Sequence, residues 1–225
     1  MSFDNAIKAL SIDALKFIKD DYVIGLGSGR AASTFVKTLS KFVKTKNFKI
    51  KCVPTSTQIK LVAEEGNLPL IETDQVEYID VVFDGADQID RNKFLIKGGG
   101  GALLRENILM SLAKKVVIIA DKTKFVNNFN RSVPVEIHPL ARNIVQKNIS
   151  KIGGESVLRS LDRGYPFVTE NGNIILDCDF GEIKNPKSLQ QKILQIPGVL
   201  EVGIFTKKPD VIYRAKFNGK FDILT

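Results

Sequence analysis

Three segments of the chain combine reactive or anion-binding residue types with a position at the end of an apolar stretch. They are Gly25 to Ala31, Asp84 to Asp90, and Lys97 to Arg105. In an open sheet of parallel strands, ligands bind in the crevice beyond the carboxyl ends of the strands. The joint position of the three segments therefore predicts one functional site.

The first segment has the sequence Gly-Leu-Gly-Ser-Gly-Arg-Ala and joins a predicted strand to a predicted helix. Glycines let backbone N–H groups approach an anion closely, and the N-terminus of a helix carries partial positive charge. The third glycine of the dinucleotide fingerprint is missing, because Arg30 takes its place, and no Walker lysine follows. The segment favours the phosphate of a small molecule over NAD or ATP. A tight turn without a ligand is the alternative.

The second segment carries the carboxylates of Asp84, Asp87 and Asp90. Acidic side chains crowded at a strand end repel one another, so they usually have a cationic partner or a purpose. A calcium loop needs oxygen ligands at alternate positions, and the glycine and apolar residues of this segment interrupt that pattern. We expect hydrogen bonding to sugar hydroxyls or proton transfer here. For Asp90 we expect only the capping of a turn.

The third segment places Lys97 before four consecutive glycines, and Glu106 follows near the start of a predicted helix. Such a glycine run costs conformational entropy and suggests a close backbone contact. Proton abstraction next to a carbonyl needs a base and an electrophile on either side of the reacting carbon. Glu106 and Lys97 fit those roles. Taken singly, a lysine on a flexible linker and a glutamate near a helix N-terminus would explain them equally well.

Hydrophobic periodicity gives the elements that must position these segments. It predicts an alternation of strands and helices, which implies right-handed crossovers and a mainly parallel sheet in an α/β fold. The predicted strands are 22–26, 48–53, 79–83 and 116–120, and the predicted helices are 6–18, 32–43, 56–65 and 102–112.

The pattern changes near Arg131 to the order strand-helix-strand-strand-helix-strand, with a hairpin signal at Glu170 to Asn173. This order is the split βαβ, ferredoxin-like layout of a small α+β domain. Residues 210–215 are expected to return to the main sheet. The sequence therefore predicts a Rossmann-like domain of residues 1–130 plus 208–225 and a smaller domain of residues 131–207 inserted near the C-terminus.

Composition narrows the class of protein. The 225 residues carry 33 Lys and Arg against 25 Asp and Glu, for a net charge of +8. This charge attracts many kinds of anion, but it is spread along the chain, and we expect no nucleic-acid partner. The lysine-rich stretch 41–51 is expected to be a solvated helix end and loop, with a nucleic-acid surface as the alternative.

The chain shows no sign of a membrane span, a secretory signal or a disulfide framework. No apolar run reaches about 18 residues, and the start lacks a basic region followed by an apolar stretch. Cys52 and Cys178 lie far apart outside any Cys-x-x-Cys pattern, which fits a reducing cytoplasm and excludes a cysteine-based zinc site. The single histidine, His138, has no paired nucleophile in view and is expected to be structural.

The residues of these segments match a known family. The chain resembles the type A ribose-5-phosphate isomerases in GLGSGRAASTFVKTL, VPTSTQIK, DVVFDGADQID, IKGGGGALLREN, VIIADKTKFV and PVEI, which span roughly residues 20–137. The joint match of DGADQID and KGGGGALLRE is highly specific. The resemblance implies a metal-independent, cofactor-free cytoplasmic isomerase of the pentose phosphate pathway that forms dimers or tetramers.

The resemblance also implies a role for individual residues. Glu106 would be the base that moves a proton between C1 and C2 through an enediolate, Lys97 would stabilise the oxygen that becomes negative, and Asp84 would help to open the sugar ring. The substrate-binding residues would be Ser28, Gly29, Arg30, Ala31, Asp84, Gly85, Ala86, Asp87, Lys97, Gly98, Gly99, Gly100, Lys124 and Lys8.

Three other functions stay open at this point. A sugar-phosphate deaminase or a CoA-transferase-like enzyme would share the fold, and ammonia release or a glutamyl thioester would reveal it. A non-catalytic sensor would bind a sugar phosphate without turning it over. The presence of Lys97, Asp84 and Glu106 argues against a sensor. A nucleic-acid binder is motivated only by the net charge.

The chain departs from the family in its phosphate loop, where Arg30-Ala31 replaces the usual Ser-Thr and removes two hydroxyl donors. We expect Arg30 or a nearby lysine to compensate. Arg30→Ala should then raise KM for the sugar phosphate, as measured by steady-state kinetics. An unchanged KM would indicate that the Arg30 side chain points into solvent.

Overall fold

A computed structural model describes residues 3–225, and the chain divides into two compact units. Unit 1 contains the described residues up to Ala86, together with Arg105–Lys124 and Pro209–Thr225. Unit 2 contains Asp87–Leu104 and Phe125–Lys208. The chain therefore passes from one unit to the other within the acidic segment and again just before Glu106.

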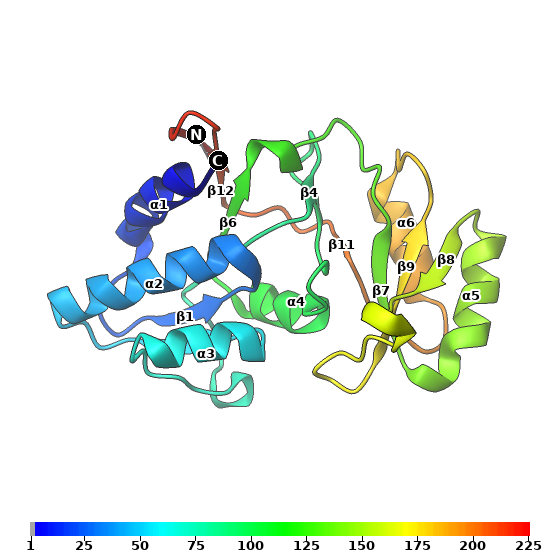
Figure 1. Ribbon diagram of the computed structural model, residues 1–225, viewed down its shortest axis with the longest axis horizontal. Coiled ribbons are helices and arrows are strands. Elements are labelled where there is room, and N and C mark those ends of the chain that lie inside the picture. Colours follow the sequence, from blue (N-terminus) through cyan, green and yellow to red (C-terminus); the bar gives the residue numbers. More distant parts are fainter. Residues whose placement is uncertain (1–2) are drawn as a thin grey trace. The chain divides into compact units, whose positions relative to one another are not determined.

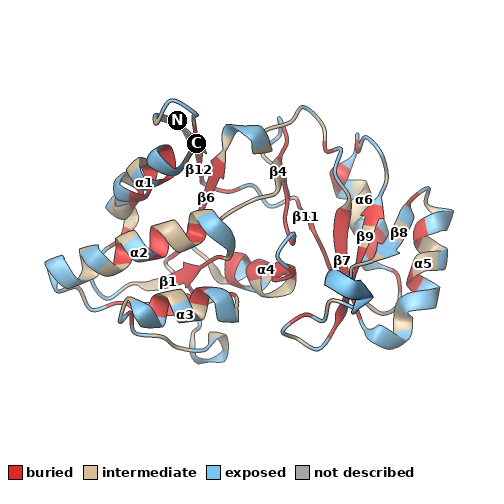
Figure 2. Cartoon of the chain, in the orientation of Figure 1, coloured by how far each residue is buried: buried red, intermediate tan, exposed pale blue. Residues whose placement is uncertain are grey.

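Unit 1 is built on a six-stranded sheet with the order β13-β12-β6-β3-β1-β2 (Figure 1). All neighbouring pairs are parallel except β12 and β13, which are antiparallel. The strands are β1 (Val23–Leu26), β2 (Lys51–Pro54), β3 (Val81–Asp84), β6 (Val116–Asp121), β12 (Val211–Ala215) and β13 (Phe221–Leu224). The central strands are almost continuously buried, as expected for a parallel sheet covered on both faces (Figure 2).

Helices cover both faces of this sheet. On one face, α1 to α3 share a buried cluster with alternate strand residues, and the Phe35 ring of α2 stacks on the Phe83 ring of β3 with centroids 3.9 Å apart. On the other face, Leu109 of α4 lies close to Gly25 and Val82. The helices are α1 (Phe3–Ala14), α2 (Gly29–Lys46), α3 (Thr57–Glu65) and α4 (Leu103–Leu112).

Unit 2 has an antiparallel four-stranded sheet with the order β10-β7-β9-β8 and two helices (Figure 1). Side chains of both helices pack in one cluster with Val133, Val135, Ile137, Leu176 and Cys178, so both helices cover the same face. The elements are β7 (Val133–Ile137), α5 (Arg142–Lys151), β8 (Glu155–Leu158), β9 (Ile174–Asp179), α6 (Pro186–Leu194) and β10 (Val199–Val202).

A second, three-stranded sheet in unit 2 was not expected from the sequence. It has the order β11-β5-β4, with β4 (Gln88–Ile89), β5 (Leu95–Ile96) and β11 (Ile204–Phe205) all antiparallel. Strands of two residues are too short to show a period, which is why the hydrophobic pattern did not reveal them. Strand β13 was missed as well.

The predicted fold class is confirmed: a mainly parallel α/β sheet carries a smaller α+β unit with the predicted ferredoxin-like strand and helix order. Strand β12 lies parallel to β6 and returns the chain to the main sheet, as expected. The hairpin signal at residues 170–173 marks a real turn, in which Thr169 N–H donates to Asn173 O at 2.8 Å. Its first arm is only a single bridge between Val168 and Ile174, because β8 already pairs with β9 at Leu176, where this ladder would continue.

The structural units and the predicted domains divide the chain differently at three places. Residues 87–104, 125–130 and 208 group with the smaller unit, whereas the sequence assigned them to the larger domain. The reason lies in the short sheet, since β4 and β5 pair with each other and with β11, which belongs to the smaller unit.

Among the described residues, no helix is both long and apolar enough to cross a membrane.

Candidate active site

The strand order of the main sheet reverses at β1, with β2 on one side and β3 on the other. Gly27 directly follows β1, and Asp84 is the last residue of β3. Because ligands of open α/β sheets bind at such a reversal, beyond the carboxyl ends of the strands, this edge is where a ligand is expected. The first two segments singled out in the sequence meet there.

Asp84 is held against the glycine-rich turn. Its side chain is buried, and Oδ1 accepts hydrogen bonds from the N–H of Ser28 at 3.2 Å and the N–H of Gly85 at 2.7 Å. A Cβ atom on Gly27 would lie 2.1 Å from the Asp84 Cγ. Position 27 therefore has to be glycine for the Asp84 carboxylate to lie where it does.

The glycine-rich turn leads into α2 with Ser28 as the N-cap residue and Gly29 at φ +89°, a conformation that favours glycine. Ser28 Oγ does not cap the helix but forms hydrogen bonds with Thr55 Oγ1 at 2.7 Å and Ser56 Oγ at 3.1 Å. The Gly29 N–H donates to Gln58 Oε1 at 3.2 Å. The start of α2 is therefore lined by oxygen atoms as well as by backbone amides.

Sequence reasoning did not single out Thr55, Ser56 or Gln58 as part of the site. These residues follow β2, which is the parallel neighbour of β1, so the strand-end rule that found the other segments also applied to them. Their hydroxyl and amide types, directly after a predicted strand, were the available signal.

The remaining predicted phosphate contacts from unit 1 have different surroundings. The side chains of Arg30 and Lys8 are exposed, and neither forms an ion pair within residues 3–225. Ala31 is half-buried in the first turn of α2. Lys124 is half-buried and ends a 3-10 turn, Lys122–Lys124, that directly follows β6 beside β3.

Glu106 lies in the first turn of α4 and is 5% exposed. A carboxylate at this end of a helix is favoured by the helix dipole. Gly85 and Ala86, where the chain first leaves unit 1, are half-buried.

In unit 2, the hairpin formed by β4 and β5 brings Asp87 beside the glycine run. The Asp87 N–H donates to Ile96 O at 2.7 Å, and Asp87 Oδ2 accepts the Gly99 N–H at 2.7 Å. Asp90 closes this hairpin by accepting the N–H groups of Asn92 and Phe94, each at 2.8 Å. The expectation that Asp90 caps a turn is confirmed.

Lys97 directly follows β5 and is 3% exposed. Its N–H donates to Gly203 O at 2.9 Å, which continues the ladder toward β11, and its Nζ lies 5.9 Å from the centroid of the Phe205 ring. The backbone at Lys97 is therefore fixed on one side by a strand. The glycine run begins at the next residue.

The glycine run forms a tight turn in which the Gly101 N–H donates to Gly98 O at 3.0 Å. Gly98 and Gly101 have φ values of +97° and +84°. A side chain at Gly101 would also collide with the Phe167 ring at 2.5 Å. Gly99 and Gly100, between them, are exposed.

Other reactive groups are poor candidates for chemistry. Burial raises the pKa of the Cys52 thiol to about 12, and burial with the nearby Asp177 raises that of Cys178 to about 12, so neither is a ready thiolate. His138 Nδ1 accepts the Leu140 N–H at 3.3 Å and caps a short turn, in line with the structural role expected for it. Within residues 3–225, no three His, Cys, Asp or Glu side chains gather as a metal site requires.

Comparison with known proteins finds relatives that belong to one family. The model of the family described as ribose 5-phosphate isomerase A (phosphoriboisomerase A) matches residues 51–219. A relative named ribose-5-phosphate isomerase A from Prochlorococcus marinus subsp. pastoris is 40% identical over 216 residues, 94% of each chain. A relative of the same name from Methanocaldococcus jannaschii is 37% identical over 220 residues, 96% of each chain.

Solved structures agree with the sequence relatives. The ribose 5-phosphate isomerase A of Methanocaldococcus jannaschii superimposes with a TM-score of 0.92 at 35% identity, covering 99% of this chain and 98% of that one. A D-ribose-5-phosphate isomerase solved in complex with phospho-erythronic acid superimposes with a TM-score of 0.94 at 36% identity, covering 100% of this chain and 99% of that one.

The contact between Gly27 and Asp84 generates a test. Gly27→Ala should displace the Asp84 carboxylate and lower the turnover of ribose 5-phosphate by about tenfold or more, since misplacing a reacting group by about 1 Å can cost about 10²-fold. Gly66→Ala is the comparison, because its new Cβ would lie 2.8 Å from the Ser40 side chain, outside the site. Equal kcat values for two folded variants would contradict the prediction.

Proposed function

The chain belongs to the ribose 5-phosphate isomerase A family and is a ribose 5-phosphate isomerase, and we propose that Glu106, Lys97 and Asp84 carry its reaction through an enediolate intermediate. The substrate is the open-chain aldehyde of ribose 5-phosphate, and the product is the ketone ribulose 5-phosphate. The observation that carries the proposal is the buried carboxylate of Glu106 in the first turn of α4.

Glu106 is the proposed base. Its carboxylate removes the proton from C2 of ribose 5-phosphate, and the electron pair of that bond forms the C1–C2 double bond of the enediolate. The same carboxyl group then returns the proton to C1 while the hydroxyl proton of O2 passes to O1, so that the carbonyl forms at C2. One group serves both steps because the two carbons are adjacent. Burial supports this role, since a base shielded from water returns the proton to the substrate rather than losing it to solvent.

Lys97 is the proposed electrophile. Negative charge moves onto the carbonyl oxygen as the proton leaves carbon, and an ammonium group placed there lowers the energy of the transition state. The backbone of Lys97 is fixed by its hydrogen bond to Gly203 O at 2.9 Å, and its side chain is buried. The ammonium group therefore loses little conformational entropy when the substrate binds.

Asp84 is proposed to open the furanose ring and to carry protons between hydroxyl groups. Its Oδ1 is occupied by the N–H groups of Ser28 and Gly85. These two bonds fix the plane of the carboxyl group, so Oδ2 has one defined direction in which to meet a hydroxyl.

The rest of the substrate is proposed to be bound by backbone and charge. The phosphate lies against Ser28 to Ala31 at the start of α2, where Arg30 and Ala31 supply amides and Lys124 and Lys8 supply charge. The sugar hydroxyls meet Gly85, Ala86 and Asp87, and Gly98 to Gly100 line the site. The partly positive N-terminus of an 18-residue helix supports the phosphate assignment.

We also propose that the enzyme needs no metal or cofactor, acts in the cytoplasm and serves the non-oxidative pentose phosphate pathway. The acid–base and electrophilic groups named above suffice for a proton transfer between adjacent carbons. The two buried thiols fit a reducing compartment. For the domains, we propose that the parallel-sheet part is the catalytic Rossmann-like domain.

The first test is formation of ribulose 5-phosphate from ribose 5-phosphate by the purified protein with EDTA present. Activity should survive the chelator. Glu106→Gln should leave a folded protein that binds substrate and turns over at least about 10²-fold more slowly, because the amide cannot accept the proton. Near-normal turnover would reject Glu106 as the base, and a loss of activity that added metal restores would reject the metal-free mechanism.

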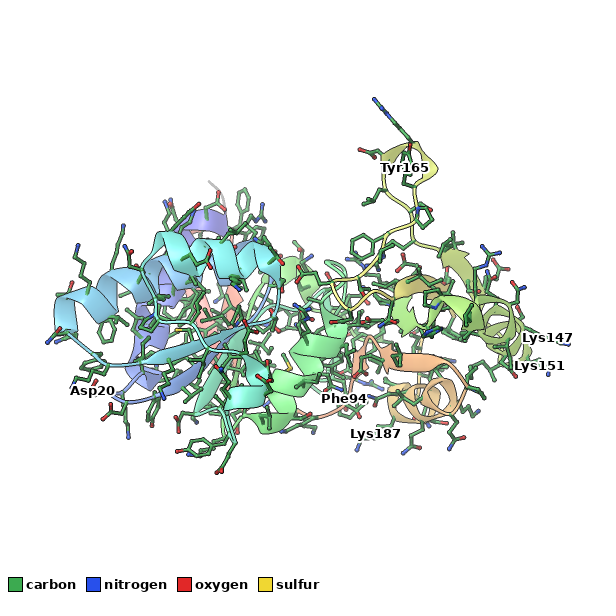
Figure 3. The ribbon with its side chains drawn as sticks, turned by 90° about the horizontal axis from the view of Figure 1, so that it is seen from below. Asp20, Phe94, Lys147, Lys151, Tyr165 and Lys187 are labelled. Carbon is green, nitrogen blue, oxygen red and sulfur yellow. The ribbon has the colours of Figure 1, made fainter. Side chains whose placement is uncertain are left out.

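We further propose that the chain forms a homo-oligomer through unit 2, with a second copy as the partner. Large apolar side chains are exposed along residues 140–168 of this unit, and Figure 3 shows the segment that carries Tyr165 projecting from the rest of the unit. Exposed apolar groups gathered in one region mark interaction surfaces. They are Leu140 at 91%, Val157 at 70%, Tyr165 at 68%, Val168 at 58%, Leu161 at 56% and Ile144 at 45% exposure.

Charge argues for a second copy rather than an unrelated partner. Asp162 and Arg163 are consecutive residues of the short 3-10 helix before Tyr165, so two copies related by a two-fold axis can pair each charge with its opposite. Tyr165→Glu should shift the protein toward monomer in sedimentation velocity, whereas Tyr78→Glu, at an exposed tyrosine of unit 1, should not. A wild-type protein that sediments as a monomer would reject the proposal.

A further inference from the structure

One arginine outside the predicted site holds the glycine turn of unit 2. Arg159 Nη1 donates to Gly98 O at 2.7 Å and lies 3.3 Å from Gly99 O. The other edge of its guanidinium group forms a bidentate pair with Asp177, through Nε at 2.9 Å and Nη2 at 2.5 Å. A carboxylate therefore fixes one edge of the guanidinium group, and the other edge donates hydrogen bonds to backbone carbonyls.

The small sheet explains why Arg159 lies there. Ile174, Leu176 and Cys178 of β9 face the helices, so Asp177 projects from the opposite face. Arg159 directly follows β8, and its N–H continues the ladder to Ile175 O at 2.9 Å. The side of the sheet that carries no helix thus presents a rigid arginine to the turn.

Because peptide groups are planar, the hydrogen bonds from Arg159 to the carbonyls also set the direction of the neighbouring N–H groups. Gly98 O and the Gly99 N–H belong to one trans peptide, so they point in opposite directions. Arg159 holds the carbonyl end, and Asp87 Oδ2 accepts the N–H end at 2.7 Å. The next peptide has its carbonyl at Gly99 and its N–H at Gly100, so the Gly100 N–H also points away from Arg159.

The glycines of the turn make the contacts of Arg159 with Gly98 O and Gly99 O, called the clamp below, necessary. A glycine residue rotates about φ and ψ more freely than any other, and here glycines stand on both sides of the two peptides. A side chain at Gly100 would meet no atom within 4 Å, so packing does not hold the turn at that point. Hydrogen bonds to the carbonyls are what remain to fix the orientation of the amides.

We propose that Arg159, oriented by Asp177, is a positioning residue that aims the Gly100 amide at an oxygen atom of the sugar, while Asp87 holds the Gly99 N–H. Arg159 itself touches no reacting atom. Its effect passes through the two peptide planes to hydroxyl or enediolate oxygens, which gain negative charge as the proton leaves carbon. The expected fall in kcat rests on the proposed function. The fixed orientation of the glycine turn does not.

The kinetic experiment compares the wild-type enzyme with Arg159→Ala and Arg159→Lys. Amides aimed at a developing charge act mainly in the transition state, so Arg159→Ala should lower kcat about tenfold to 10²-fold while KM changes less than about threefold. Lysine cannot pair with a carboxylate and reach two carbonyls at once, so Arg159→Lys should recover only part of the loss.

Chemical rescue separates positioning from a loss of folding. Methylguanidine added to Arg159→Ala should raise kcat at least about threefold and leave the wild-type enzyme unchanged, because it supplies the missing donors without restoring the side chain.

Arg214→Ala is the matched control. Arg214 forms a similar pair with Asp222, through Nε at 3.1 Å and Nη2 at 2.6 Å, on strands β12 and β13 of unit 1. It should keep wild-type kcat and KM even if its melting temperature falls. Wild-type kinetics in Arg159→Ala, or a loss that methylguanidine leaves untouched and Arg214→Ala shares, would overturn the proposal.

Hydrogen exchange tests the geometry without reference to catalysis. The Gly99 amide should exchange at least about tenfold faster in Arg159→Ala than in the wild-type protein, while amides of β9 keep their rates. Unchanged exchange at Gly99 would overturn the clamp. If the wild-type protein does not isomerise ribose 5-phosphate, the proposed function is wrong. The exchange rates at Gly99 still test whether Arg159 holds the turn.

Discussion

The close approach of Asp84 to the turn after β1 is the constraint on which the larger unit depends. A buried carboxylate is costly unless polar groups surround it, and here the amides of Ser28 and Gly85 supply hydrogen bonds worth about 1.5–3 kcal/mol each when one partner is charged. Those amides are available because β1 and β3 are neighbours and the chain turns sharply after each. Gly27 is the residue that makes room for the carboxylate.

In the smaller unit, too, a few charged side chains fix a glycine turn. Asp87 and Arg159 grip opposite ends of one peptide, and each is fixed by a second partner: Arg131 Nη1 lies 3.8 Å from Asp87 Oδ1, and Asp177 pairs with Arg159. In both units a carboxylate thus binds backbone amides of the glycine turn and fixes its conformation. Backbone amides do not change protonation state, so a turn held in this way keeps the same donors at every turnover.

Part of the smaller unit supports this arrangement from a distance. Glu136 of β7 is buried on the same face of the sheet as Asp177, and its Oε1 accepts hydrogen bonds from Thr169 Oγ1 at 2.8 Å, Asn171 Nδ2 at 3.0 Å and Asn173 Nδ2 at 2.9 Å. The three donors come from the turn that precedes β9. One carboxylate thereby ties the turn to the central strand of the small sheet, beside the strand that carries Asp177.

The sequence by itself determined the class of fold, the order of most elements and the three segments with chemical residue types, because periodicity and glycine content are local properties of a chain. It could not determine the hairpin of β4 and β5 that places Asp87 beside Gly99, since two-residue strands have no period. Nor could it reveal Thr55 and Ser56 beside Ser28, or Arg159 on the glycine turn 61 residues earlier. Those pairings depend on strand order and on which face of a sheet a side chain leaves from, and only the tertiary structure decides both.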